Sequence, residues 1–282
     1  MNMNALREFW FQFSRHRGAV AGVIIFVMIL VMAATAGLVL DHGPLELVGK
    51  PFLRPGENFR YPLGTDSLGR DVLAGIFFGA RVSLLIGVTA TIIATTVGVT
   101  IGALSGYYGG WLDDGLMRFT EIFQTIPAFM LMIVIVAILQ PSIGIIVTAI
   151  GLTSWPEIAR LVRGEFVSLR EREFVVASRG IGMSDIRIIC TQILPNSIAP
   201  VVVMGSFIVA RAILNESGLA FLGLGDPNVM SWGAMIGKGR EVLRIAEYLT
   251  VIPGIAILLT VLALNMLGDG LNDALNPWQK ER

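Results

Sequence analysis

The residues of this chain that could ligate a metal ion or act as a catalytic base are few and far apart. The sequence holds two histidines, His16 and His42, and a single cysteine, Cys190. The histidines flank opposite ends of an apolar run, so they cannot share a metal ion or activate a common nucleophile. Cys190 has no second thiol to pair with and lies among apolar residues, which favours a small core residue. We therefore expect neither a catalytic site nor a metal site on this chain.

Motifs for nucleotide chemistry are also missing. The stretch from Gly233 to Gly239 reads GAMIGKG, which has the wrong glycine spacing for a Walker A loop and no serine or threonine after Lys238. Gly223-Leu224-Gly225 resembles the beginning of a dinucleotide fingerprint, but the third glycine and a preceding strand are absent. We expect that this chain hydrolyses no ATP and holds no cofactor.

The composition is that of a membrane protein. Of the 282 residues, 54% are hydrophobic and 15% are charged, whereas soluble domains carry about 25% charged residues. The mean hydropathy is +0.73. The formal net charge is zero, and no basic stripe points to nucleic acid.

Uncharged apolar stretches predict the spanning helices, because about 20 such residues cross a hydrocarbon core about 30 Å thick. One stretch is long enough for two crossings, and Pro141 supplies a turn in its middle because proline lacks a helical donor. We predict an all-α membrane protein with six transmembrane helices, at about residues 18–40, 82–106, 119–139, 143–161, 195–216 and 248–268.

An even number of crossings puts both ends of the chain on one side of the membrane. We place both termini in the cytoplasm, because the arginine-rich segment from Glu157 to Arg187 then lies inside, as the positive-inside rule requires. A secretory signal peptide is the alternative for the first apolar run, which is longer than the usual signal core of about 7–15 residues. The chain then divides into an N-terminal part (1–81), a permease core (82–270) with a cytoplasmic loop (162–194), and a tail (271–282).

Polar side chains within the predicted helices are the candidates for a solute path. An ion-coupled carrier would need ionisable groups at mid-membrane, and the apolar runs hold none. Arg211 and Glu216 come nearest, and with Asn215 we expect them toward the external end of the fifth helix, facing the path or a binding protein. The threonines between Thr89 and Thr100 could line a lumen, but we expect most of them to bond to carbonyl groups of their own helix.

The cytoplasmic loop has the pattern of two short helices joined at a glycine. Helix-forming residues precede Gly182, Ser184 can cap a second helix at Asp185, and Pro195 closes the segment. Such an elbow suits insertion into a groove on another protein. An ordinary amphipathic connector is the alternative.

The spacing in this loop resembles the EAA loop of ABC importer permeases, which is E-A-A, three residues, G, nine residues and I-x-L-P. Ala177, Gly182 and Leu194-Pro195 match that pattern, whereas Val176 and Gln192 depart from it. Four further segments resemble the C-type permease of dipeptide, oligopeptide and nickel ABC importers: GTDSLGRD (64–71), GARVSLLIG (79–87), ESGLAFLGLG (216–225) and LGDGLNDALNP (267–277).

This resemblance covers nearly the whole chain and implies a type I ABC importer permease fold in the bacterial inner membrane. It implies half of a translocation pathway for di- or oligopeptides, although nickel and sugars stay open as cargo. The implied partners are a second homologous permease, two ATP-binding subunits that hold ATP and Mg, and an external solute-binding protein. A self-sufficient channel or carrier and an intramembrane enzyme are the alternatives. The residues implied to couple to the ATPase are Glu173, Ala177, Ser178, Arg179, Gly182, Asp185, Leu194 and Pro195.

Overall fold

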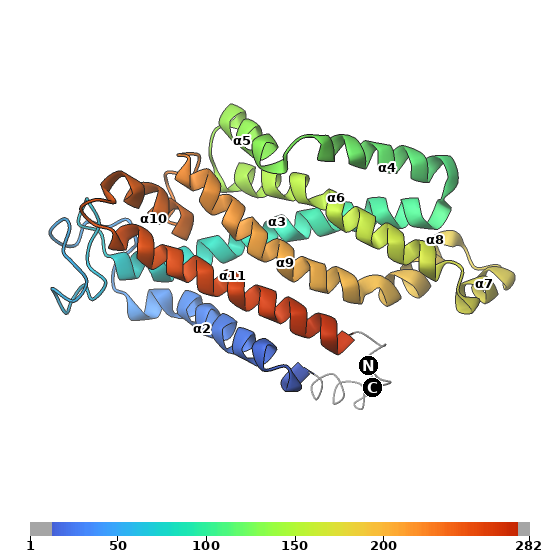
Figure 1. Cartoon of the computed structure of the whole chain (residues 1–282), viewed down its shortest axis with the longest axis horizontal. Helices are drawn as coiled ribbons and strands as arrows, with labels where there is room; N and C mark the ends of the chain where they lie inside the picture. Colours follow the sequence, from blue (N-terminus) through green and yellow to red (C-terminus); the bar gives the residue numbers. More distant parts are fainter. Residues whose placement is uncertain (1–12, 276–282) are drawn as a thin grey trace.

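The computed structural model describes residues 13–275, which fold into an elongated bundle of helices (Figure 1). In this part of the chain, strand pairing is confined to an isolated bridge between Thr65 and Asp71. Five helices are long and apolar enough to cross a membrane: α2 (Arg17–Val39), α3 (Val72–Tyr108), α6 (Ile143–Leu169), α9 (Leu194–Phe221) and α11 (Tyr248–Leu275).

The sixth candidate span is broken in two. Helices α4 (Gly110–Thr125) and α5 (Ala128–Leu139) meet at a bend of 78°. The prediction of one helix at 119–139 was therefore wrong. Pro127 has no backbone donor and disfavours helical geometry in the residue before it, so Ile126 is extended and the helix stops there.

Several other helices run past their predicted ends. Helix α3 begins at Val72, where the side chain of Asp71 accepts a 2.9 Å hydrogen bond from the amide of Leu73. Helix α6 continues through Pro156 to Leu169 instead of ending near 161, because prolines inside membrane helices are tolerated where neighbouring helices support the backbone.

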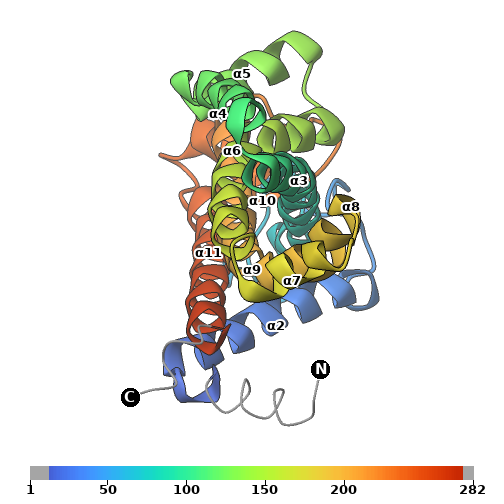
Figure 2. The ribbon, with the colours of Figure 1, turned by 90° about the vertical axis from the view of Figure 1, so that its right-hand side faces the viewer.

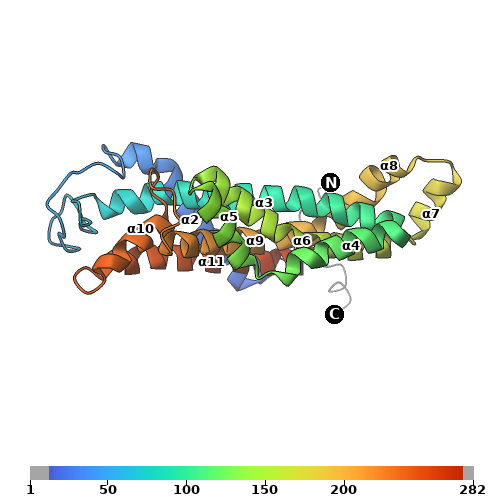
Figure 3. The same cartoon turned by 90° about the horizontal axis from the view of Figure 1, so that it is seen from above.

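The two ends of the bundle differ in character. Residues 41–71 and α10 (Trp232–Gly239) lie at one end of the long axis, whereas α7 (Glu173–Gly180) and α8 (Asp185–Ile188) extend beyond the other (Figures 1 and 3). The start of α2 and the end of α11 lie at the α7 end as well, with His16 Nε2 3.8 Å from Asp273 Oδ2. We call these the external end and the cytoplasmic end, following the predicted orientation. Figure 2 looks onto the cytoplasmic end, where α7 lies crosswise to the long helices.

Helices α3 and α6 approach each other closely because glycines line the contact. A Cβ atom added to Gly98 would lie 2.6 Å from the Cβ of Ile158, and one added to Gly106 would lie 2.6 Å from the Cβ of Phe166. Small residues allow such backbone approach in membranes, where no hydrophobic effect drives helices together. The two helices therefore form a firm unit from the membrane centre to the cytoplasmic end.

Trp232 holds the external end together. Its ring is fully buried, and its Nε1 donates a 2.9 Å hydrogen bond to the carbonyl oxygen of Ile76 in α3. Its backbone amide donates to Ser83 Oγ at 3.2 Å. Tyr248, at the start of α11, brings its hydroxyl within 2.9 Å of the carbonyl oxygen of Leu53 and so fixes the external loop.

Candidate functional site

Helices α7 and α8 form the predicted elbow at the cytoplasmic end. Gly182 lies between them with a φ of +79°, a left-handed conformation that costs free energy for any residue with a side chain. Ser184 precedes α8 with extended backbone as an N-cap residue would, although its side chain makes no capping hydrogen bond. The prediction of two short helices joined at a glycine is confirmed.

The elbow presents apolar side chains to its surroundings. Ile181 is 81% exposed, Ile186 is 72% exposed and Val176 is 55% exposed, and Phe174 is exposed beside them. We call these four residues the apolar tip. They lie beyond the ends of the long helices, and exposed apolar side chains gathered on one element are typical of a contact with protein or with the membrane surface.

Side chains beneath the apolar tip fix the elbow to the rest of the chain. The hydroxyl of Tyr107 in α3 donates a 2.7 Å hydrogen bond to Asp185 Oδ1. The guanidinium carbon of Arg179 lies 5.1 Å from the centre of the Tyr107 ring, and Val175 and Ile188 are fully buried. The elbow is thus held as a defined structure.

The predicted coupling residues fall into three groups. Glu173, Ala177 and Gly182 are exposed and free to meet a partner. Ser178 is buried and donates to the carbonyl oxygen of Phe174 in its own helix, while Arg179 and Asp185 are exposed but contact Tyr107. The last two, Leu194 and Pro195, lie in the first turn of α9.

Pro195 does not separate the elbow from the next span, as its position had predicted. Helix α8 passes through a π-helical turn, η1 (Ile189–Ile193), directly into α9. Pro195 therefore lies inside a continuous helical segment, just after the π-helical turn, where the backbone hydrogen-bond pattern is already altered. Helices α8 and α9 form one continuous helical segment, which contains Pro195 and Pro200.

A polar cluster ties α3, α4 and α6 together near the cytoplasmic end. Arg163 binds Asp113 in a bidentate manner, with Nε–Oδ1 and Nη2–Oδ2 distances of 2.6 Å. Ser105 also donates to Asp113, and Arg170 donates to the carbonyl oxygen of Gly106 at 3.0 Å. Planar pairs of this kind fix orientation as well as distance.

A second bidentate pair lies deep in the membrane region. The guanidinium of Arg211 in α9 contacts Glu157 in α6, with both N–O distances at 2.6 Å. Glu157 follows the external start of α6 by about 21 Å, and Arg211 precedes the external end of α9 by about 15 Å, at 1.5 Å per residue. Both depths fall within a hydrocarbon core about 30 Å thick.

This pair corrects one expectation about the membrane region. The apolar runs were predicted to hold no ionisable group, with Glu157 in the cytoplasmic segment. Helix α6 continues past Pro156, however, so Glu157 lies within the helix, on the surface of the bundle, and contacts Arg211. Arg211 was predicted toward the external end of its helix, and it does lie nearer to Phe221 than to Leu194 in α9. A charged side chain at the bilayer centre costs about 2.5–3.5 kcal/mol even on the scales that give the smallest cost. Two such residues at this depth therefore point to a functional role.

The other two predicted pathway residues differ in burial. Glu216 is 2% exposed, and its Oε1 accepts a 2.5 Å hydrogen bond from the hydroxyl of Ser231. Asn215 is half-buried. The structure brings Arg211 together with Glu157 and leaves Glu216 in the interior of the chain.

The threonines of α3 mostly satisfy their own helix, as predicted. Thr91 and Thr96 each donate a 2.8 Å hydrogen bond to the carbonyl group four residues earlier, and Thr100 does so at 2.7 Å. Ser83 instead accepts from Trp232. Helix α3 therefore contributes few unsatisfied polar groups.

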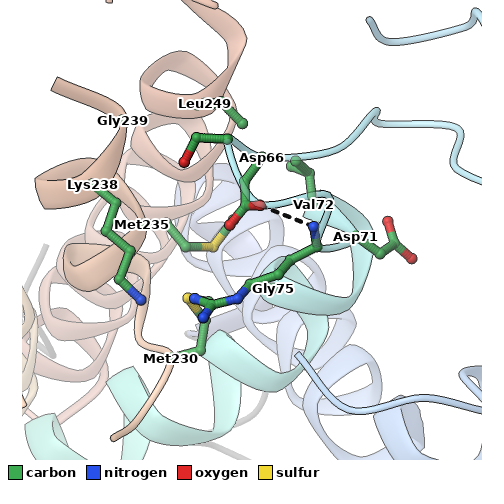
Figure 4. A pocket seen from close by; sticks show the side chains of 11 residues that line it. Asp66, Asp71, Val72, Gly75, Met230, Met235, Lys238, Gly239 and Leu249 are labelled. Carbon is green, nitrogen blue, oxygen red and sulfur yellow. Dashed lines mark hydrogen bonds between the residues drawn. The ribbon is translucent and has the colours of Figure 1, made fainter. Parts of the chain in front are cut away.

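A small pocket at the external end gathers charged side chains (Figure 4). Asp66 Oδ1 accepts a 2.9 Å hydrogen bond from the Arg70 amide. Lys238 of α10 lines the same pocket, where partial desolvation and the charge of Arg70 lower the pKa of its ammonium group. The cationic side chains of Arg70 and Lys238 thus lie in one pocket, where the external loop contacts α10.

Within residues 13–275, no three histidine, cysteine, aspartate or glutamate side chains come together as a metal site would require. The arrangement instead offers a cytoplasmic contact surface, a charged pair at membrane depth and a packed external end.

Comparison with known proteins agrees with this arrangement. Residues 98–281 match the family described as the binding-protein-dependent transport system inner membrane component. Residues 4–50 match the N-terminal TM domain of oligopeptide transport permease C.

Individual relatives cover nearly the whole chain. The chain is 37% identical to the dipeptide transport system permease protein DppC of Haemophilus influenzae, over 98% of this chain and 96% of that protein. It is 37% identical to the glutathione transport system permease protein GsiD of Pectobacterium atrosepticum, over 96% of this chain and 90% of that protein. The di/tripeptide transport system permease protein DppC of Pseudomonas aeruginosa is also 37% identical, with 96% and 92% covered.

A solved structure shares the fold. The inward-facing MetNI methionine ABC transporter contains a chain that superposes with a TM-score of 0.58 at 16% identity, covering 72% of this chain and 96% of that one. The type I importer permease fold is therefore confirmed. The chain belongs to the binding-protein-dependent transport system inner membrane components and is a non-catalytic, multi-pass permease subunit of a bacterial ABC importer.

Proposed function

We propose that this permease imports di- or oligopeptides and couples to ATP-binding subunits through the elbow of α7 and α8. A second homologous permease completes the translocation pathway, two ATP-binding subunits supply the energy, and an external binding protein delivers the solute. The apolar tip carries the coupling proposal, because three of its side chains are more than half exposed at the cytoplasmic end.

The connections of the elbow supply a mechanism. An ATPase subunit that closes on nucleotide displaces α7 and α8 as a unit, because Tyr107 and the buried Val175 and Ile188 hold them in place. The displacement reaches α9 through the continuous helix at η1 and reaches α3 through Tyr107. The spanning helices then move as rigid bodies and open the path to the other side.

The cargo is proposed from the relatives. Their names specify dipeptides, di- and tripeptides, and glutathione. These solutes share amide bonds and oppositely charged termini. A path suited to them needs polar groups of both signs, which this chain provides at Glu157 and Arg211.

Gly182 offers a direct test of coupling. Gly182→Val cannot adopt a φ of +79° without strain, although nothing lies within 4 Å of an added Cβ. We expect uptake per ATP hydrolysed by the assembled importer in proteoliposomes to fall by about tenfold, equivalent to about 1.4 kcal/mol of lost coupling. Gly182→Asn is the matched control, because asparagine tolerates this backbone conformation and should retain most uptake. Normal coupling in Gly182→Val would refute the role of the elbow.

The apolar tip can be tested separately. Ile181→Asp changes an exposed side chain, so the permease should still insert and fold, but the ATP-binding subunits should no longer copurify with it. Phe59→Asp, on a fully exposed side chain of the external loop, is the control and should leave the complex intact. Equal recovery of ATPase subunits with both variants would contradict the proposal.

A further inference from the structure

The Glu157–Arg211 pair is placed where lipid could not accommodate it. In the isolated chain, 38% of the Glu157 side chain and 46% of the Arg211 side chain remain exposed. The contact uses two of the five N–H donors of the guanidinium, which leaves polar atoms facing outward at mid-membrane depth. Hydrocarbon offers such atoms no hydrogen bond.

The surface that this chain turns to lipid looks different. Helix α2 exposes Ile24, Val27, Met28 and Val31, and no charged residue lies between Gly18 and Leu40. Helix α9 also exposes apolar side chains, Val202 and Leu214 among them, so the contrast with α2 lies in the charged pair itself, which lipid would not accommodate.

Polar neighbours extend the pair along the same surface. Ser154 precedes Glu157 by three residues and Asn215 follows Arg211 by four, so each lies one helical turn from its charged neighbour on the same face. Arg160, three residues after Glu157, is exposed. Helices α6 and α9 pack against each other and lie side by side in Figure 1, so these polar residues lie near the pair, with the exposed Leu214 among them.

We infer that Glu157 and Arg211 face the water-filled path between this chain and its partner permease, and that they bind the charged termini of a passing peptide. This inference rests on the proposed peptide cargo. A peptide carries one ammonium group and one carboxylate group, so it can replace the contact between Glu157 and Arg211 with one ionic contact to each of them. Its ammonium group binds Glu157 and its carboxylate binds Arg211, and no charge is left unpaired. The planar guanidinium suits a carboxylate because both bonds form together.

The first experiment tests which surface the pair faces, independently of cargo. In a Cys190→Ser background, Ser154→Cys and Leu214→Cys place a thiol one turn from each charged residue, and Met28→Cys places one on the exposed face of α2. The assembled importer, in membranes, is treated with a membrane-impermeant, charged thiol reagent. We expect the two thiols near the pair to react at least about tenfold faster than the α2 thiol, because the thiolate that reacts requires water. Equal or slower reaction overturns the inference.

The second experiment separates solute binding from a structural ion pair, using dialanine uptake. The single variant Arg211→Gln leaves a carboxylate unpaired, so it impairs assembly under either role. The double variant Glu157→Gln/Arg211→Gln removes both charges, and a purely structural pair would then regain uptake together with assembly. We expect the double variant to assemble and to retain stimulated ATP hydrolysis, while dialanine uptake stays at least about tenfold below that of the unaltered importer.

The results distinguish this inference from the proposed function. Wild-type uptake by the double variant would overturn peptide binding at the pair while leaving the importer assignment intact. If the unaltered importer carries no dialanine or other short peptide, the proposed cargo fails and peptide binding at the pair fails with it. The thiol reaction would in that case still decide whether the pair lines the path.

Discussion

The hydroxyl of Tyr107, at the end of α3, donates a hydrogen bond of 2.7 Å to Asp185, the first residue of α8. The two residues are 78 positions apart in the chain. Arg179 of α7 lies over the same ring. One tyrosine therefore contacts both helices of the elbow and joins them to a spanning helix that also carries the α6 contact.

Tyr107→Phe removes the hydroxyl and keeps the ring under Arg179. We expect the elbow to loosen by about 1 kcal/mol, the usual contribution of such a hydrogen bond. Uptake per ATP should fall while the amount of assembled importer stays unchanged. Tyr108→Phe, on the exposed neighbouring residue, is the control. An unchanged ratio of uptake to hydrolysis in Tyr107→Phe would show that the bond is dispensable for coupling.

Gly102→Ala should disrupt the contact between α3 and α6. An added Cβ would overlap the carbonyl oxygen of Ala159 and lie 2.8 Å from the Cβ of Val162. Overpacking of this kind costs about 1–3 kcal/mol, so a thermal assay in detergent should show earlier unfolding. Gly164→Ala on α6 is the control, since nothing lies within 4 Å of its added Cβ. Matching stability of the two variants would contradict the observed packing.

Asp113→Asn keeps the shape of the side chain but leaves Arg163 without its anionic partner. Because the Asp113 side chain is 14% exposed and that of Arg163 is 40% exposed, we expect a discounted loss of about 1–2 kcal/mol in resistance to unfolding. Asp114→Asn, on the exposed adjacent residue, should have little effect. Adding Arg163→Gln to Asp113→Asn should recover part of the loss, and its failure to do so would argue against a direct pair.

Ser231→Ala should loosen α10 at the external end. The Ser231 hydroxyl accepts a 2.9 Å hydrogen bond from the amide of Ala234 as the helix N-cap, and it donates to Glu216. Loss of an N-cap costs about 0.5–2 kcal/mol, so limited proteolysis should cut faster between α9 and α11. Ser168→Ala, at an exposed position in α6, is the control. Unaltered cleavage would show that the Ser231 hydroxyl is dispensable and that the packing of α10 on α9 and α11 holds it in place.

Hydropathy located five of the six predicted spans, because they are separated by charged or turn-forming residues. The elbow also followed from local signals, since Gly182 is needed for a positive φ and Ser184 is placed as an N-cap. Both features depend on residues close together in the chain.

The features that hydropathy missed depend on contacts between distant segments. Glu157 was assigned to the cytoplasm because Pro156 and the charges after it look like a helix end, yet α6 continues and Arg211 compensates the carboxylate. The break at Pro127 lies inside an apolar stretch, where composition alone cannot distinguish a straight span from a bent one. The predicted contact residues Ser178 and Asp185 bond within the chain, and only the folded arrangement reveals Tyr107 as the partner of Asp185.

Residues Asp185 to Phe221 form one uninterrupted helical element with a single π-helical turn. A flexible joint between the elbow and α9 would absorb any displacement before it reached the bilayer. The π-helical turn, Pro195 and Pro200 lie within this element and are the positions where it would bend most readily. Because the helix is nevertheless unbroken, we expect tilting of α8 at the cytoplasmic end to displace Arg211, about 39 Å away along the axis at 1.5 Å per residue. Nucleotide turnover on one side of the membrane and binding of a charged solute within it would then act on the same helix.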